Sequence, residues 1–295
     1  MIVINRVVIL FLLLLLFPLN ISAATSVFVS ILPLKFFVDK IVEDKMSVSV
    51  MVEPGHGPET YSPGPKQMEA LGKAKLYLHL GLPFEKVLVK KIAKINHGTK
   101  VVNVREGIEA VTLTGHGGHG DHGDHGDHED DPHIWSSPRL TIKMVEVIAK
   151  ELLLLAKEQK VAAKELEAME VRAKKLQEEL LILDGEIKSK LGAYRGRQFL
   201  AYHPAWGYFA HDYGLKQLSI EMHGKSPGPR DLLQLSKIIK ESKIKTMFMP
   251  KQLNRSLGKS WEESNKLAVK VIDPLAYDYF VSIREFCGEL VKSFE

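Results

Sequence analysis

The middle of the chain reads PRLTIKMVEVIAKELLLLAKEQKVAAKELEAMEVRAKKLQEELLILDGEIKSKL, residues 138–191. This segment has a single proline, at its start, and is rich in Ala, Leu, Glu and Lys, which are strong helix formers. Its apolar residues recur at steps of three and four, the spacing of a helix face. The pattern predicts two helices, over about 138–156 and 158–191. The second would extend for roughly 45–50 Å, which suits either a coiled coil or a rigid connector between two lobes.

Strands and helices alternate on both sides of this helical segment. Before it, apolar runs such as SVFVSIL (26–32) and SVSVMV (47–52) are separated by helix-like stretches. After Gly192 the alternation returns with the run QFLAYH (198–203). Such alternation is typical of parallel sheets with helices on their faces. The predicted fold class is therefore α/β, with two lobes of mainly parallel sheets flanked by helices and joined by a long connecting helix.

The N-terminus has the layout of a secretory signal. Arg6 precedes the apolar run VVILFLLLLLFPL and the small residues SAAT follow it, so residues 1–24 are predicted to be a cleaved signal peptide. The apolar run is about a dozen residues long, whereas a membrane span needs roughly 20. We expect a soluble periplasmic chain, not embedded in a membrane. It would have an N-terminal lobe at 25–137, connecting helices at 138–192 and a C-terminal lobe at 193–295.

Charge and cysteine content bear on several classes of protein. The formal net charge is +4, and acids and bases are both abundant and dispersed, which indicates ordinary solvated surface and no nucleic-acid partner. The chain has one cysteine, Cys287, so an intramolecular disulfide is impossible. Its half-apolar surroundings predict a buried, unreactive thiol.

Half of the chain's twelve histidines lie within HGGHGDHGDHGDHEDDPHIW, residues 116–135. Five of them recur every third residue among glycines and aspartates: His116, His119, His122, His125 and His128. Segment 116–130 lacks the apolar residues that would offset its ordering entropy, so we expect a mobile loop. Its imidazoles can capture zinc, copper or nickel as auxiliary ligands. A solubilising insert with incidental metal affinity is the other interpretation.

The stretch HEDDPH ends at His133 and is close to the zinc-protease motif H-E-x-x-H. Its second histidine comes five residues after the first, not four, and Pro132 argues against the helix that would place both on one face. This departure disfavours a zinc hydrolase. The chain also has no GxSxG motif and no phosphate-binding glycine loop of the expected spacing.

Further candidate metal ligands fall where predicted strands end. His203 closes the run FLAYH, and Asp273 closes VKVID. His56 and Glu59 follow the second predicted strand, and His133 precedes the connecting helices. Ligands of parallel α/β sheets bind beyond the carboxyl ends of the strands, and histidines with carboxylates suit zinc. Each residue has a structural interpretation as well, as a hydrogen-bonded histidine or a turn-starting aspartate.

Four motifs resemble the zinc-binding, ZnuA-like periplasmic receptors of bacterial metal ABC importers. They are PGHGPETYSP (54–63), DPHIW (131–135), AYHPAWGYFAHDYGL (201–215) followed by SIEMHGKSPGP (219–229), and IDPL (272–275). Their order and spacing agree over essentially the whole mature chain. The resemblance implies two α/β lobes bridged by a long helix, one metal ion between them, and no enzymatic activity.

The resemblance also implies a ligand set. The histidines of DPH and YHPAW are His133 and His203 here, and the aspartate of IDPL is Asp273. Manganese-binding relatives tend to have glutamate in place of His203, so the histidine favours zinc. Glu59 stands where the family commonly has a histidine, which leaves Glu59, His56 or water as the remaining ligand. Aspartate or carbonyl partners are expected for the second nitrogens of both histidines.

These features together predict a monomeric receptor that delivers Zn²⁺ to the permease and ATPase of an ABC importer. Two other functions fit parts of the pattern. One is a periplasmic zinc buffer or chaperone that acts mainly through the loop at 116–130. The other is a receptor of the same family for manganese or another divalent metal.

Overall fold

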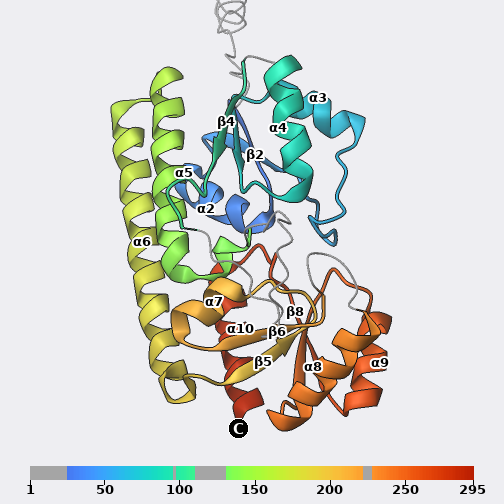
Figure 1. Cartoon of the computed structure of the whole chain (residues 1–295). Coiled ribbons are helices and arrows are strands. Elements are labelled where there is room, and N and C mark those ends of the chain that lie inside the picture. Colours follow the sequence, from blue (N-terminus) through green and yellow to red (C-terminus); the bar gives the residue numbers. More distant parts are fainter. Residues whose placement is uncertain (1–24, 96–97, 110–130, 222–227) are drawn as a thin grey trace, which may run out of the picture.

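The computed structural model describes residues 25–95, 98–109, 131–221 and 228–295. It has two α/β lobes, one above the other in Figure 1, with two long helices along one side. The predicted signal peptide and the histidine-rich loop at 116–130 lie outside the described residues. Among the described residues, no helix has the length and apolarity that crossing a membrane requires.

A four-stranded parallel sheet forms the centre of the first lobe. Its strands are β1 (Thr25–Val29), β2 (Met46–Val50), β3 (Leu76–His79) and β4 (Lys100–Asn103), in the order β2-β1-β3-β4. Its helices are α2 (Leu32–Val42), α3 (Pro65–Lys73) and α4 (Pro83–Ile95). Phe28 and Tyr77 pack towards α3 and α4, whereas Val27 and Val29 belong to the core on the α2 side. Both faces of the sheet are therefore covered, as is usual for parallel sheets.

The second lobe repeats this topology. Its strands are β5 (Gln198–Ala201), β6 (Lys216–Ser219), β7 (Thr246–Pro250) and β8 (Ala268–Ile272), in the order β6-β5-β7-β8. Its helices are α7 (Gly207–Tyr213), α8 (Pro229–Glu241), α9 (Arg255–Asn265) and α10 (Tyr279–Phe294). Leu200 and Met247 form a core with Leu235 of α8. Phe199 and Phe286 pack on the opposite side.

Helices α5 (Pro138–Glu158) and α6 (Ala163–Leu191) connect the lobes, flanked by the short helices η1 (Ile134–Ser136) and η2 (Gly192–Tyr194). The predicted start of the second helix at residue 158 was wrong, because Lys160 adopts φ +56° and ends the helical path. Helix α6 still spans roughly 43 Å at 1.5 Å per residue. It packs against α2 in the first lobe and against α7 and α10 in the second. The predicted α/β fold with a long connecting helix is confirmed.

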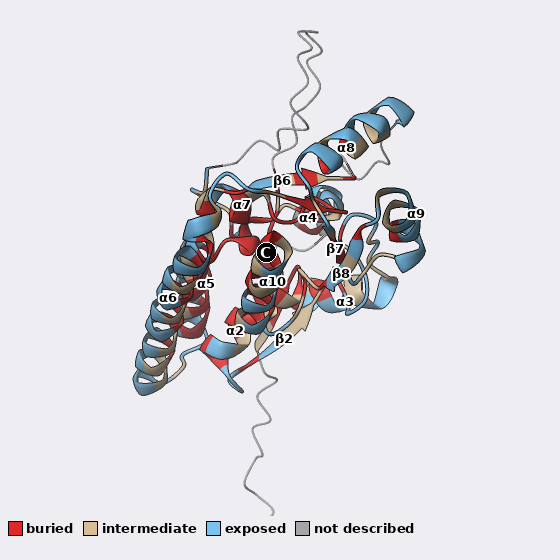
Figure 2. Ribbon diagram, turned by 90° about the horizontal axis from the view of Figure 1, so that it is seen from below, coloured by how far each residue is buried: buried red, intermediate tan, exposed pale blue. Residues whose placement is uncertain are grey.

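One apolar cluster runs through both lobes along these connecting helices. Leu180 and Leu183 of α6 are fully buried and belong to the same cluster as Phe37 of α2 and Phe286 of α10. Helix α6 has a buried face and an exposed face. Figure 2 shows its buried residues towards α5 and its exposed residues on the outer side. Cys287 lies in this core and is buried, as predicted. A shared core of this kind stiffens the connection and limits the hinge motion available to the lobes.

Candidate metal site

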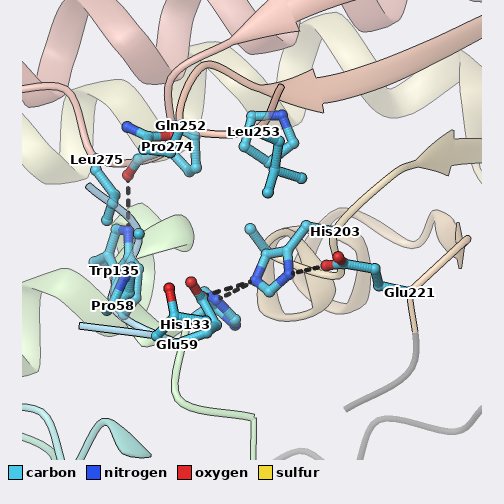
Figure 3. Close-up of a pocket in the computed structure, with 14 residues that line it drawn as sticks. Pro58, Glu59, His133, Trp135, His203, Glu221, Gln252, Leu253, Pro274 and Leu275 are labelled. Carbon is cyan, nitrogen blue, oxygen red and sulfur yellow. Dashed lines mark hydrogen bonds and ion pairs between the residues drawn. The ribbon is translucent and has the colours of Figure 1, made fainter. Parts of the chain in front are cut away.

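Three side chains from separate parts of the sequence meet between the lobes. Glu59 lies in the loop after β2, His133 directly precedes η1, and His203 follows β5. One ligand atom from each lies within 4.8 Å of the other two. Both histidines are buried, whereas the Glu59 side chain is 36% exposed. Figure 3 shows His133 and Glu59 facing His203 from the opposite side of the site.

The spacing of these atoms suits a single zinc ion. His203 Nε2 lies 3.2 Å from His133 Nε2 and 3.2 Å from Glu59 Oε1. A tetrahedral zinc ion with ligands at about 2.0–2.1 Å holds neighbouring ligand atoms roughly 3.3 Å apart. Both distances from His203 are therefore close to those that a bound zinc ion requires. Two nitrogens and one carboxylate oxygen also form a ligand set that zinc accepts readily.

Carboxylates orient the two imidazole rings. His133 Nδ1 lies 2.6 Å from Asp131 Oδ1, which also accepts a 2.9 Å hydrogen bond from the His133 main-chain N–H. His203 Nδ1 lies 2.9 Å from Glu221 Oε2. An ionised carboxylate only accepts hydrogen bonds, so each Nδ1 carries a hydrogen and each ring turns its Nε2 atom inward. The expected aspartate partner is confirmed at His133, whereas the partner of His203 is a glutamate.

Sequence reasoning missed Glu221 as the partner of His203. Glu221 follows β6, at the carboxyl edge of the sheet where the other candidate residues also lie. It lies 18 residues from His203 in the sequence, with no local motif joining the two. The neighbouring parallel strands β5 and β6 bring these two positions together.

The charges around His203 strongly perturb its pKa. Burial by itself lowers the pKa of His203, but hydrogen bonds and charge attraction from Glu221 and Glu59 outweigh burial and raise the pKa to about 9. Burial raises the pKa of Glu59, and the contact with His203 more than offsets this, so its pKa lies below the usual value. Two carboxylates thus supply negative charge to a buried position that attracts a cation.

Zinc binding is expected to release about one proton near neutral pH, because His203 with a pKa of about 9 must lose its Nε2 hydrogen to coordinate the ion. The apparent affinity should rise roughly tenfold per pH unit between about pH 6 and pH 8, since proton competition weakens towards the pKa. Calorimetry in buffers of different ionisation enthalpy measures the release. Glu221→Gln should reduce it, because the variant lowers the pKa of His203. A binding enthalpy independent of the buffer would contradict this prediction.

The other two sequence candidates, Asp273 and His56, lie in a neighbouring cavity. Asp273 follows β8, and its Oδ1 accepts hydrogen bonds from Gln252 Nε2 at 2.6 Å and from Leu275 N–H at 2.9 Å. His56 packs edge-on against Tyr61, with ring centroids 5.9 Å apart. Both line a cavity of about 100 Å³ beside the three-residue group. The structure therefore brings Glu59, and neither of these residues, to the two histidines.

The cavity that opens onto Glu59, His133 and His203 has a volume of about 150 Å³. Its opposite wall consists of Gln252, Leu253, Pro274 and Leu275 from the second lobe. A cavity needs roughly 10–15 Å³ of such space to hold a water molecule, so this one has room for water as a fourth ligand. Across this cavity, the Trp135 Nε1–H donates a 2.9 Å hydrogen bond to the Pro274 carbonyl and joins the lobes beside the site.

Two α/β lobes joined by a long helix, with candidate ligands converging between them, define a two-lobed binding protein. The family model described as "Zinc-uptake complex component A periplasmic" matches residues 27–292. The chain belongs to this family of periplasmic metal-binding receptors of ABC importers, whose members act in transport and not as enzymes.

Individual relatives agree with this assignment. The chain is 26% identical over 262 residues to a protein of Chlamydia trachomatis named "Putative metal-binding protein", with 88% of each chain covered. It is 25% identical over 249 residues to the "Zinc-binding lipoprotein AdcA" of Streptococcus pneumoniae, covering 82% of this chain and 48% of that one. The crystal structure of ZnuA superposes with a TM-score of 0.80 at 30% identity, covering 92% of this chain and 100% of that one.

Proposed function

We propose that this protein is a receptor that binds Zn²⁺ between its lobes and delivers it to an ABC importer. His133, His203 and Glu59 would supply three ligands and water the fourth. The observation that carries this proposal is the approach of these three side chains from both lobes to within 4.8 Å of one another. Asp131 and Glu221 would fix the orientation of the two histidines.

Several observations support zinc as the cargo. Two imidazole nitrogens favour zinc over manganese, which prefers oxygen ligands. The spacing of 3.2 Å between the His133 and His203 Nε2 atoms fits a tetrahedral ion. Among the relatives, AdcA is named as zinc-binding, and a deletion mutant of ZnuA has been crystallised with zinc bound. The resemblance of the motifs also suggests Asp273 as a ligand, but its Oδ1 accepts hydrogen bonds from Gln252 and the Leu275 N–H, and the residue lines the neighbouring cavity.

The location and partners follow from the same proposal. Residues 1–24 would direct the chain to the periplasm and be cleaved there. The loaded receptor would then dock on the permease of an importer driven by its ATPase. The lobes would close only slightly around the ion, because α6 packs against helices of both.

Deletion of residues 116–129 tests the proposal against a zinc buffer that acts through its histidine-rich loop. The deletion variant is expected to keep one tight zinc site with an affinity close to that of the full chain, because Glu59, His133 and His203 lie outside the deleted segment. Weaker additional binding should disappear, since the five repeated histidines are removed. Calorimetry with a competing chelator measures both. Loss of the tight site on deletion would refute the assignment, and competition with Mn²⁺ tests the choice of metal.

A further inference from the structure

The main-chain carbonyl of Asp131 receives hydrogen bonds from both lobes. Arg105, which follows β4 in the first lobe, donates from its Nη2 at 3.1 Å. Tyr208, in α7 of the second lobe, donates from its hydroxyl at 3.0 Å. Tyr208 is buried with a relative exposure of 1%, and Asp131 is fully buried. One carbonyl thus joins the two lobes two residues before the candidate ligand His133.

The position of the Asp131 side chain depends on these hydrogen bonds to its main-chain carbonyl. Its Oδ1 accepts both hydrogen bonds from His133, one from the ring and one from the main chain. Its Oδ2 is buried and has no hydrogen-bond donor among the described residues. The carboxylate is therefore not fixed in place from its other side. The orientation of the His133 ring follows from the position of the Asp131 main chain.

Arg105 also connects the Asp131 carbonyl to the sheet of the first lobe. Its Nη1 lies 3.5 Å from the carbonyl of Leu80, which directly follows β3. The guanidinium thus spans the end of β3 and the segment that carries His133. A planar guanidinium presents its donors in a fixed geometry, so it can hold two carbonyls at a set separation. The first lobe therefore supplies a rigid reference for Asp131, and Tyr208 supplies the contact from the second lobe.

We propose that Arg105 and Tyr208 are positioning residues that hold His133 in its metal-binding orientation through the Asp131 carbonyl, with Tyr208 coupling this orientation to the arrangement of the lobes. The inference rests on the proposed zinc site and adds a route for release. A small displacement of the second lobe is enough to withdraw the Tyr208 hydroxyl, which loosens Asp131 and turns His133 out of position. Partners that orient metal ligands commonly change affinity by roughly 10–100-fold when replaced.

Tyr208→Phe tests the coupling, with Tyr213→Phe as its matched control. Tyr213 lies on the same helix, is also buried, and donates its hydroxyl to Asp184 of α6, away from the site. Tyr208→Phe is expected to weaken zinc binding about tenfold, mainly through faster dissociation. It should also shift the visible absorption of bound Co²⁺, which reports ligand geometry. Tyr213→Phe should change neither property, although both variants lose a buried hydroxyl.

Substitutions of Arg105 provide a second, independent test of the positioning role. Arg105→Met keeps the apolar stem and removes both donors, so it should weaken zinc binding at least as much as Tyr208→Phe. Arg105→Lys retains one cationic donor and should restore part of the affinity. Equal effects of Tyr208→Phe and Tyr213→Phe, or an unchanged Co²⁺ spectrum in Tyr208→Phe, would overturn the inference while leaving the zinc site intact. Failure of the unsubstituted protein to bind zinc would instead overturn the proposed function, and the inference with it.

Discussion

Replacement of His203 by alanine is expected to abolish tight zinc binding. The substitution removes the nitrogen that lies 3.2 Å from both His133 Nε2 and Glu59 Oε1. It also leaves Glu221 without its imidazole partner. Loss of partners that only orient ligands costs roughly 10–100-fold in affinity, so loss of a ligand should exceed about 100-fold. Calorimetry with a competing chelator measures the change.

His211→Ala is the matched control for this substitution. His211 lies on α7, only a short distance along the chain, but its side chain is 67% exposed and outside the three-residue group. The control should bind zinc like the unsubstituted protein. If His203→Ala kept its tight zinc binding while removal of the histidine-rich loop abolished it, the loop would be the working site. That result favours a zinc buffer over a receptor with an interlobe site.

Replacement of Glu85 by alanine is expected to destabilise the folded protein strongly. The carboxylate of Glu85 is fully buried and accepts hydrogen bonds from the hydroxyls of Ser30 and Tyr77. It also accepts from the N–H groups of Leu80 and Leu82, at 3.1 and 2.9 Å. Each buried donor left without an acceptor costs about 1–3 kcal/mol. The free energy of unfolding should therefore fall by about 3 kcal/mol or more, measured by urea denaturation of the metal-free protein.

Two further variants distinguish the loss of the hydrogen bonds to Glu85 from a general effect of losing a carboxylate. Glu69→Ala removes an exposed glutamate on α3 whose ion pair with Lys73 is open to solvent, so its effect should be within about 0.5 kcal/mol. Glu85→Gln keeps one oxygen acceptor for the two N–H groups, and its amide can donate to the hydroxyls. We expect the free energy of unfolding of Glu85→Gln to lie between those of Glu85→Ala and Glu69→Ala. Equal stability of Glu85→Ala and Glu69→Ala would show that the network contributes nothing.

The fold followed from the sequence because its signals are local. Strands such as SVFVSIL and the helix-forming run at 138–191 carry their periodicity within short windows. The boundary between the connecting helices was harder to place. Lys160 ends the helical path with a left-handed φ of +56°, although lysine is a good helix former and lacks the signature of a break.

The candidate site could be predicted only in part from the sequence. His133 and His203 were identified by their motifs, and the structure places their Nε2 atoms 3.2 Å apart. Glu59 was one of three alternatives, and its place beside His203 depends on how the loop after β2 folds across the cavity. Asp273 matched its motif equally well, yet it lines the adjacent cavity, where its Oδ1 accepts hydrogen bonds from Gln252 and the Leu275 N–H.

The sequence by itself determined the kinds of ligand, the alternation of strands and helices, and the long connection between lobes, because residue type and spacing are properties of the chain. Only the tertiary structure decided which side chains meet. Glu221 reaches His203 because β5 and β6 are neighbours in a parallel sheet. Arg105 and Tyr208 meet at the Asp131 carbonyl because the two lobes pack on the same long helix. Such distances depend on packing between distant segments, and no local pattern encodes them.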